Sequence, residues 1–329
     1  MTSYRSIGVA GAGAWGLALA NAAAGAGRDV KLWGRDGEAI RELRLGRQSS
    51  RLPGVALLEG VRVTEDLAAL ASCDATLLAT PAQSTREMAA RLAAAFAEPR
   101  PLVVCAKGIE LGTNLFMTQV LAEAAPLWPS AILSGPSFAA DVAAGLPTAV
   151  TLAATDGRQA ADLCQAVRSP SLRLYHSTDV RGVEIGGAAK NVLAIACGVA
   201  SGLGLGPSAS AALTARGFAE LRRFGDALGA RAETLMGLSG LGDLVLTCST
   251  SRSRNFAFGV ALGRGRTLAE ARAGALAEGA TTVASLMNLA RAKSVEMPIA
   301  AAVEALIAGE IDARAAVVGL LSRPPREEG

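Results

Sequence analysis

Lysine is the side chain that most directly suggests chemistry in this sequence, because it is rare. Only four occur, Lys31, Lys107, Lys190 and Lys293, among 32 Lys plus Arg residues in a chain of 329. Arginine therefore supplies nearly all of the positive charge. A lysine that persists in such a chain is a candidate for a task that a guanidinium cannot perform, such as giving up a proton.

Lys190 lies in the segment Ile-Gly-Gly-Ala-Ala-Lys-Asn-Val, residues 185–192. On a helix a side chain leans over the preceding turn, and Gly186 and Gly187 in that turn leave room for a ligand. A desolvated lysine beside a ligand can act as a general acid or base. The alternative is that the glycines serve helix packing and that Lys190 extends its charge to solvent.

A glycine-rich turn, Gly-Ala-Gly-Ala-Trp-Gly, occupies residues 11–16 between an apolar strand pattern at 6–10 and a helical pattern at 15–26. In that context the glycines allow a tight turn and a close backbone approach to a pyrophosphate at the helix N-terminus. The alternative is a tight turn without a ligand. The residues expected to bind a dinucleotide here are Gly11, Gly13 and Gly16.

The end of the second predicted strand, residues 29–33, indicates which dinucleotide is bound. Sites for NAD usually have Asp or Glu there, bonded to the ribose 2′-hydroxyl. This sequence has Gly34 in that place and Arg35 beside it, and Arg can hold a 2′-phosphate through charge-assisted hydrogen bonds. We predict NADPH as the preferred cofactor. NADH is the alternative, because a shift of one or two residues would make Asp36 the acidic residue.

Other candidate residues follow later strands of the same predicted sheet. In an open parallel sheet, ligands bind beyond the carboxyl ends of the strands. Lys107 follows the strand at 102–106, and Gly135 and Ser137 follow the strand at 131–134. Lys107 is therefore expected in the cofactor crevice. An ordinary surface lysine after a strand is the alternative.

The second half of the chain has two unusual polar segments. Residues 239–243, Ser-Gly-Leu-Gly-Asp, place Asp243 in a glycine-rich loop. Residues 247–255 are rich in hydroxyl, Arg and Asn side chains, which suit the several acceptor oxygens of a phosphate. A polar helix-capping loop is the alternative for this second segment.

The elements that position these residues fall into two groups. Short apolar runs alternate with amphipathic helices up to about residue 178, which predicts a mostly parallel sheet covered on both faces. Alanine-rich helical patterns follow at 179–200, 210–228, 267–273, 281–292 and 299–308. We predict an α/β Rossmann-like domain over 1–178, an all-α substrate-binding domain over 179–322 and a frayed tail at 323–329. The predicted strands lie at 6–10, 29–33, 75–80, 102–106, 131–134, 148–152 and 172–175.

Composition argues against several classes of protein. The net charge is +3 and aromatic residues make up 4%, which gives no basis for binding nucleic acid. The uncharged stretches 7–27 and 191–215 are too rich in glycine for a membrane span. His176 is the only histidine and no two cysteines are close in sequence, so no metal site is expected, and reduced thiols in a cytoplasm fit best.

Several motifs occur in one order along nearly the whole chain: GAGAWG at 11–16, AKGI at 106–109, SGPSFA at 134–139, EIGGAAKNV at 184–192, SGLGDL at 239–244, TCSTSRSRN at 247–255 and AEGATT at 277–282. Together they resemble the bacterial NAD(P)+-dependent glycerol-3-phosphate dehydrogenases. The resemblance implies a Rossmann-like domain followed by a helical domain of the 6-phosphogluconate-dehydrogenase C-terminal type. It also implies the reversible reduction of dihydroxyacetone phosphate to sn-glycerol 3-phosphate, a phospholipid precursor, by a cytoplasmic homodimer.

The resemblance also assigns residues. Lys190 matches the proton acceptor of the oxidation direction, and Asp243 would hold the region around it. Lys107 would contact both cofactor and substrate. The substrate contacts implied are Gly135, Ser137, Ser253, Arg254 and Asn255. The further cofactor contacts implied are Ala14, Trp15, Arg35, Ala139, Arg254, Leu276 and Glu278.

The sequence departs from the family at Ala14, which lacks a hydroxyl often found in the phosphate loop. It also departs at 206–210, where the family usually carries Asn. Two other functions stay open. One is a related dehydrogenase acting on a hydroxy acid or a sugar acid, and the other is a non-catalytic NADPH sensor. The sensor would need neither Lys107 nor Lys190.

Overall fold

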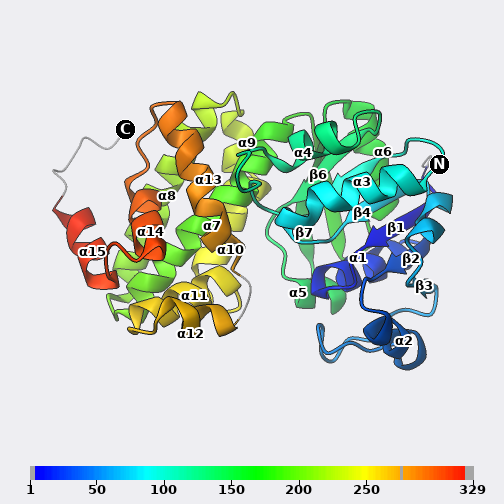
Figure 1. Cartoon of the computed structure of the whole chain (residues 1–329), viewed down its shortest axis with the longest axis horizontal. Helices are drawn as coiled ribbons and strands as arrows, with labels where there is room; N and C mark the ends of the chain where they lie inside the picture. Colours follow the sequence, from blue (N-terminus) through cyan, green and yellow to red (C-terminus); the bar gives the residue numbers. More distant parts are fainter. Residues whose placement is uncertain (1–3, 275–276, 323–329) are drawn as a thin grey trace. The chain divides into compact units, whose positions relative to one another are not determined.

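The computed structural model describes residues 4–274 and 277–322 (Figure 1). The chain divides into two compact units. The first comprises Met1–Lys107 and Leu115–Glu184, and the second comprises Gly108–Asn114 and Ile185–Gly329. The predicted frayed tail at 323–329 lies outside the described residues.

The first unit is built on an eight-stranded sheet with strand order β3-β2-β1-β4-β5-β6-β7-β8. All neighbours are parallel except β6 and β7, which confirms the predicted mostly parallel sheet. The strands are β1 (Ser6–Ala10), β2 (Asp29–Trp33), β3 (Val61–Thr64), β4 (Ala75–Leu78), β5 (Leu102–Val104), β6 (Ser130–Ser134), β7 (Thr148–Ala154) and β8 (Leu172–Ser177).

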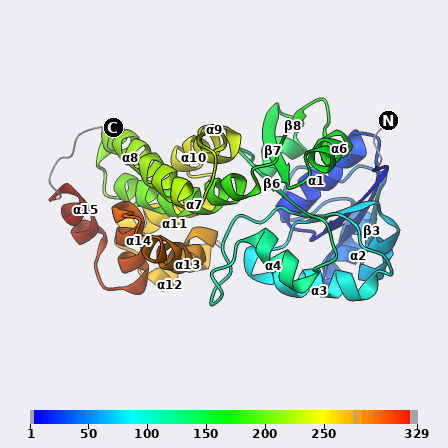
Figure 2. The same cartoon turned by 90° about the horizontal axis from the view of Figure 1, so that it is seen from above.

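Helices cover both faces of this sheet. Buried side chains of α1 (Ala14–Gly25) and α6 (Gly157–Val167) pack in the core of one face, and those of α3 (Thr85–Ala95) and α4 (Met117–Ala124) pack in the core of the other. Figure 2 shows the sheet between these two helix pairs. Continuous apolar strands are the expected result of burial on both sides.

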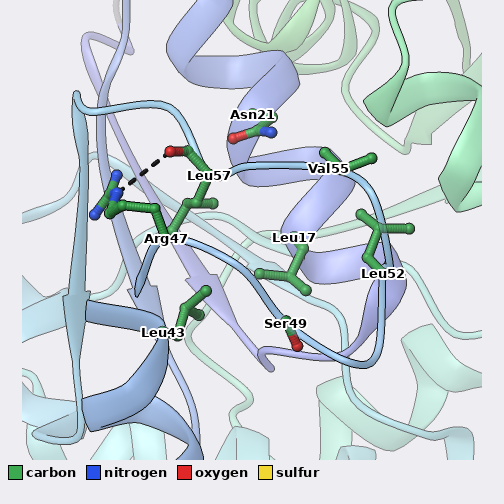
Figure 3. A pocket seen from close by; sticks show the side chains of 8 residues that line it. All are labelled: Leu17, Asn21, Leu43, Arg47, Ser49, Leu52, Val55 and Leu57. Carbon is green, nitrogen blue, oxygen red and sulfur yellow. Dashed lines mark hydrogen bonds between the residues drawn. The ribbon is translucent and has the colours of Figure 1, made fainter. Parts of the chain in front are cut away.

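A small depression in the first unit is lined by α1, α2 (Gly37–Gly46) and the loop after α2, and none of its lining residues is a predicted site residue (Figure 3). The loop leads to β3. Arg47 Nε donates to the carbonyl oxygen of Leu57 at 3.2 Å. From α1, the Asn21 side chain donates to Ala56 O and accepts from Leu58 N, both at 2.9 Å. These bonds give the depression a structural role.

The second unit is helical in its described part. Its central helix, α7 (Val180–Gly202), begins in the first unit, which ends at Glu184. The helix is long and apolar enough to cross a membrane, but 94% of its most apolar window is buried inside the protein. It packs closely on α11 (Arg254–Gly263), since a Cβ on Gly198 would collide with the carbonyl oxygen of Phe256. The other helices are α8 (Gly206–Ala227), α9 (Ala232–Met236), α10 (Asp243–Cys248), α11 (Arg254–Gly263), α12 (Leu268–Gly274), α13 (Glu278–Ala292), α14 (Pro298–Ala308) and α15 (Ala313–Leu321).

Candidate functional site

The glycine-rich turn after β1 has the backbone geometry that a phosphate cradle needs. Gly11 has φ +122°, in the region that favours glycine, and its N–H donates to Trp33 O at 2.9 Å. A Cβ at Gly11 would lie 2.7 Å from Ala79 O, and one at Gly16 would collide with Gly11 O. Both positions therefore require glycine for steric reasons.

Gly13 and the start of α1 leave the cradle open toward a ligand. Gly13 is the N-cap of α1 and has no side chain that could cap the helix. A Cβ at Gly13 would meet no atom within 4 Å. Ala14 and Trp15 form the first turn, where backbone N–H groups have no partner within a helix. The turn thus fits the pyrophosphate of a dinucleotide, as the sequence predicts.

The end of β2 explains why an acidic residue is missing there. A Cβ at Gly34 would lie 2.5 Å from Ile40 Cδ1, so a side chain of α2 occupies that space. Asp36 caps α2, and its Oδ1 accepts from Ala39 N at 3.2 Å. Arg35 is exposed between them. The Asp36 side chain is thus engaged in capping α2, whereas the Arg35 side chain is not.

Lys107, Gly135 and Ser137 converge on one carbonyl group. Lys107 Nζ donates to Gly135 O at 2.9 Å, and Ser137 Oγ donates to the same oxygen at 3.1 Å. Lys107 is half-buried, so it is not an ordinary surface lysine. Ala139 begins the short helix α5 (Ala139–Ala143) and packs on the core that includes α1. The first unit therefore brings these four predicted residues to neighbouring strand ends.

Lys190, Asp243 and Thr247 form a buried polar cluster in the second unit. Lys190 Nζ donates to Asp243 Oδ1 and to Thr247 Oγ1, each at 2.8 Å. The Thr247 hydroxyl donates to the backbone oxygen of Asp243 at 2.6 Å. The three residues are 7%, 1% and 3% exposed. The ammonium is therefore paired with a carboxylate away from water, and the alternative of a lysine that reaches solvent is wrong.

A π-helical turn, Leu238–Gly242, places Asp243 in this cluster. Gly242 N donates to Gly237 O at 3.0 Å, five residues back, and such turns occur frequently at functional sites. The expectation that Gly186 leaves room for a ligand is wrong. A Cβ there would collide with Ser239 O, so this glycine serves the packing of α7 on the π-helical turn.

The predicted phosphate segment divides into residues with different partners. Ser253 is the N-cap of α11, and its hydroxyl accepts from Phe256 N at 3.3 Å. Arg254 is exposed. Asn255 is buried and joins three helices, because its Nδ2 donates to Asn191 Oδ1 and its Oδ1 accepts from Gly279 N, both at 2.9 Å. Ser253 therefore caps a helix, as in the alternative interpretation of this segment as a polar helix-capping loop.

The remaining predicted residues are less informative. Glu278 is the first residue of α13 and is half-buried. Leu276 lies outside the described residues. His176 is exposed on β8. Sequence reasoning missed Thr247 as part of the lysine cluster, and the signal available was its position one helical turn after Asp243.

A doubly covered parallel sheet with a glycine cradle, followed by a helical unit with a buried Lys–Asp pair, defines a Rossmann-type dehydrogenase. Sequence models described as the N-terminus and the C-terminus of NAD-dependent glycerol-3-phosphate dehydrogenase match residues 6–160 and 179–318. The chain belongs to this family. The predicted family, fold class and enzyme class are confirmed, as is a cofactor of the NAD(P) type.

Relatives and solved structures agree with that assignment. Proteins from Rhodopseudomonas palustris and Bradyrhizobium diazoefficiens, both named glycerol-3-phosphate dehydrogenase [NAD(P)+], are 57% and 58% identical over 328 residues, with full coverage of both chains. The crystal structure of glycerol-3-phosphate dehydrogenase from Coxiella burnetii has a TM-score of 0.92 at 36% identity and covers 97% of this chain and 99% of that one. The yeast enzyme, at 22% identity, TM-score 0.83 and coverages of 98% and 100%, shows a shared fold.

Proposed function

We propose that the protein catalyses the reversible NAD(P)H-dependent reduction of dihydroxyacetone phosphate to sn-glycerol 3-phosphate. The buried cluster of Lys190, Asp243 and Thr247 carries this proposal, because a carbonyl reduction needs a proton donor held in place. A small phosphate ester is the substrate, as the names of the full-length relatives state for those proteins.

In this mechanism the bound reduced nicotinamide supplies the hydride. Lys190, as an ammonium, gives its proton to the oxygen of the developing alkoxide. Asp243 and Thr247 fix the direction of its N–H groups and keep it oriented. Lys107 adds positive charge where the oxyanion forms. In the oxidation direction Lys190 accepts the proton back.

The cofactor binds, in this proposal, with its pyrophosphate on the N-terminus of α1, at Gly11, Gly13, Ala14, Trp15 and Gly16. Arg35 holds a 2′-phosphate, and NADPH is preferred over NADH. The occupied space at Gly34 and the capping role of Asp36 support this choice. The other cofactor contacts proposed are Lys107, Ala139, Arg254, Leu276 and Glu278.

The substrate phosphate is held by side chains at the start of α11, namely Ser253, Arg254 and Asn255. The N-terminal end of a ten-residue helix favours an anion, and this binding energy acts away from the reacting carbon. The remaining substrate contacts proposed are Lys107, Gly135, Ser137, Lys190 and Asp243.

We also propose that the dinucleotide-binding part extends over residues 1–178 and the substrate-binding part over 179–322. The start of the second family match at residue 179 supports that boundary. A cytoplasmic homodimer without membrane insertion or bound nucleic acid, which supplies glycerol 3-phosphate for phospholipid synthesis, completes the proposal.

The test is the absorbance of the reduced nicotinamide. Purified protein is mixed with dihydroxyacetone phosphate and either NADPH or NADH, and unphosphorylated dihydroxyacetone is the control. We expect loss of absorbance that requires the phosphate and is faster with NADPH. Binding of NADPH without any oxidation would favour a sensor, and turnover only with hydroxy acids or sugar acids would favour a related dehydrogenase.

A further inference from the structure

Glu184 is a buried carboxylate to which no role has yet been given. It is 4% exposed and lies in the first turns of α7, the helix that carries Lys190. Its Oε1 accepts the backbone N–H of Thr118 at 2.7 Å. Thr118 lies in the first turn of α4, 66 residues earlier in the chain.

The start of α4 needs this acceptor. Its N-cap is Phe116, whose side chain has no oxygen, so the usual local cap is missing. Gln119 Oε1 accepts from Phe116 N at 3.1 Å, and Glu184 serves the N–H of Thr118. A carboxylate at a helix N-terminus is also favoured by the helix dipole. Glu184 therefore completes the cap of α4 from another helix.

Arg181 closes the arrangement. Its guanidinium lies 4.2 Å from the centre of the Phe116 ring, and its Nη1 forms an ion pair with Glu184 Oε2 at 3.2 Å. This pair lacks the alignment of a hydrogen bond. Two residues of α7 thus hold two residues at the start of α4, through one charge-assisted hydrogen bond and one cation–π contact, and an ion pair joins the two α7 residues to each other.

We propose that Glu184 is a positioning residue for the reduction, which fastens the first turns of α7 to the start of α4 and so holds the helix on which Lys190 lies. This inference rests on the proposed function of Lys190. Six residues separate the two side chains along α7, which corresponds to about 9 Å of helix. Misplacement of a catalytic group by about 1 Å can cost about 100-fold in rate.

The ionisation of Glu184 guides the choice of variants. Burial raises the pKa of this carboxyl, against the opposing effects of Arg181 and of the Thr118 N–H. A neutral side chain of the same shape therefore avoids the cost of a buried charge and still accepts from Thr118. Glu184→Gln is the conservative variant, and Glu184→Ala removes the acceptor. Glu123, an exposed carboxylate on α4 paired with Arg86, provides the control Glu123→Ala.

The experiment measures kcat, the alkaline limb of the pH profile of kcat, and the Kd for NADPH. It also measures amide hydrogen exchange in peptides that cover 180–192, well below the unfolding temperature. For Glu184→Ala we expect kcat to fall about 10-fold or more, the alkaline limb to move, exchange to rise, and the Kd to stay within about 2-fold. Glu184→Gln should keep most of kcat, and Glu123→Ala should match the wild type.

The proposal would be overturned if folded Glu184→Ala had the same kcat and the same amide hydrogen exchange as the wild type. It would also be overturned if Glu184→Ala and Glu184→Gln lost kcat to the same extent. If Glu184→Ala does not fold, Arg181→Met takes its place, because it removes the cation–π contact with Phe116, one of the two contacts between α7 and the start of α4, and keeps an apolar stem there. For Arg181→Met we expect an intermediate loss of kcat. A kcat equal to that of the wild type would overturn the proposal. If the wild type does not oxidise NADPH with dihydroxyacetone phosphate, the proposed function fails, while exchange still decides whether Glu184 holds α7.

Discussion

Asn255 and Asn191 share a buried side-chain hydrogen bond whose direction is set by a third group, the backbone N–H of Gly279. That N–H can only donate, so it identifies the Asn255 atom that it meets as the oxygen. Asn255 Nδ2 then faces Asn191, which must present its own oxygen. Amide orientations are normally inferred from such networks, and here one backbone group fixes two of them.

The first prediction tests this chain of amides with Asn255→Asp. The new carboxylate still accepts from Gly279 N, but its other oxygen faces the oxygen of Asn191. The Asn191 amide must then turn over, which exchanges a donor for an acceptor on the residue next to Lys190. Asn255 is one of the residues proposed to hold the substrate phosphate, and a hydrogen bond to a charged group contributes about 1.5–3 kcal/mol. If that bond is lost, we expect the KM for dihydroxyacetone phosphate to rise about 10- to 150-fold.

The control for this variant is Asn288→Asp, which adds the same charge at an exposed position on α13. Steady-state kinetics with saturating NADPH measures both variants. An Asn255→Asp protein with the KM of the wild type would contradict the assigned amide directions. Equal rises in KM for both variants would attribute the effect to charge alone.

The second prediction separates the chemistry of Lys190 from its effect on stability. Lys190→Met removes the proton donor, so kcat should fall about 100- to 10,000-fold, with the Kd for NADPH nearly unchanged. The same change leaves Asp243 buried without its charged partner, which costs about 3–5 kcal/mol. Urea unfolding should therefore show a large loss of stability.

The double variant Lys190→Met/Asp243→Asn is the matched control, because it removes both buried charges. We expect it to regain much of the lost stability and none of the lost kcat. A single variant that keeps near-normal kcat would exclude Lys190 as the proton donor. A double variant no more stable than the single one would show that the buried charge was not the cause.

Cofactor choice gives the third prediction. Arg35→Ser removes the exposed guanidinium at the end of β2, and we expect KM for NADPH to rise about 10- to 100-fold while KM for NADH hardly changes, since only NADPH has a 2′-phosphate. Arg41→Ser, an equally exposed change on α2, should leave both values unaltered. Equal changes for both cofactors would refute the preference.

Local patterns in the sequence were sufficient to predict the glycine-rich turn after β1 and the sheet. Gly11 and Gly16 are required by backbone geometry, and a strand-to-helix turn with that spacing is recognisable without contacts. The pattern did not reveal β3, because four residues, Val61–Thr64, alternate too briefly to stand out. The antiparallel direction of β7 was also not predictable, since it depends on the connection from β6.

The candidate site was predictable where one residue type was rare or one motif was dense, as for Lys190 and Asp243. Their partners were not. Asn191 and Gly279 meet through Asn255 across three helices, and the sequence pattern of each helix says nothing about the other two. Gly186 was misinterpreted for the same reason, because the atom that fills its space belongs to Ser239, 53 residues later.

The fourth prediction concerns pH and the buried thiols. Burial raises the pKa of Cys73 to about 11, and those of Cys105 and Cys164 to about 12. In the unfolded chain these thiols ionise near pH 9, so above that pH the unfolded state loses protons that the folded state keeps. Stability should therefore fall as pH rises from about 9 to 11, and these groups should have no effect below pH 8.

Urea unfolding midpoints at pH 8 and pH 10.5 test this for the wild type and for Cys105→Ala/Cys164→Ala. The other titrating groups, Tyr and Lys among them, are common to both proteins, so the difference between the two pH dependences isolates the thiols. Each thiol contributes at most about 1.4 kcal/mol per pH unit. The variant should be less stable than the wild type at pH 8, because it loses buried volume. Between pH 8 and pH 10.5, however, its stability should fall by less than that of the wild type. Parallel losses would mean that the two thiols already ionise in the folded protein.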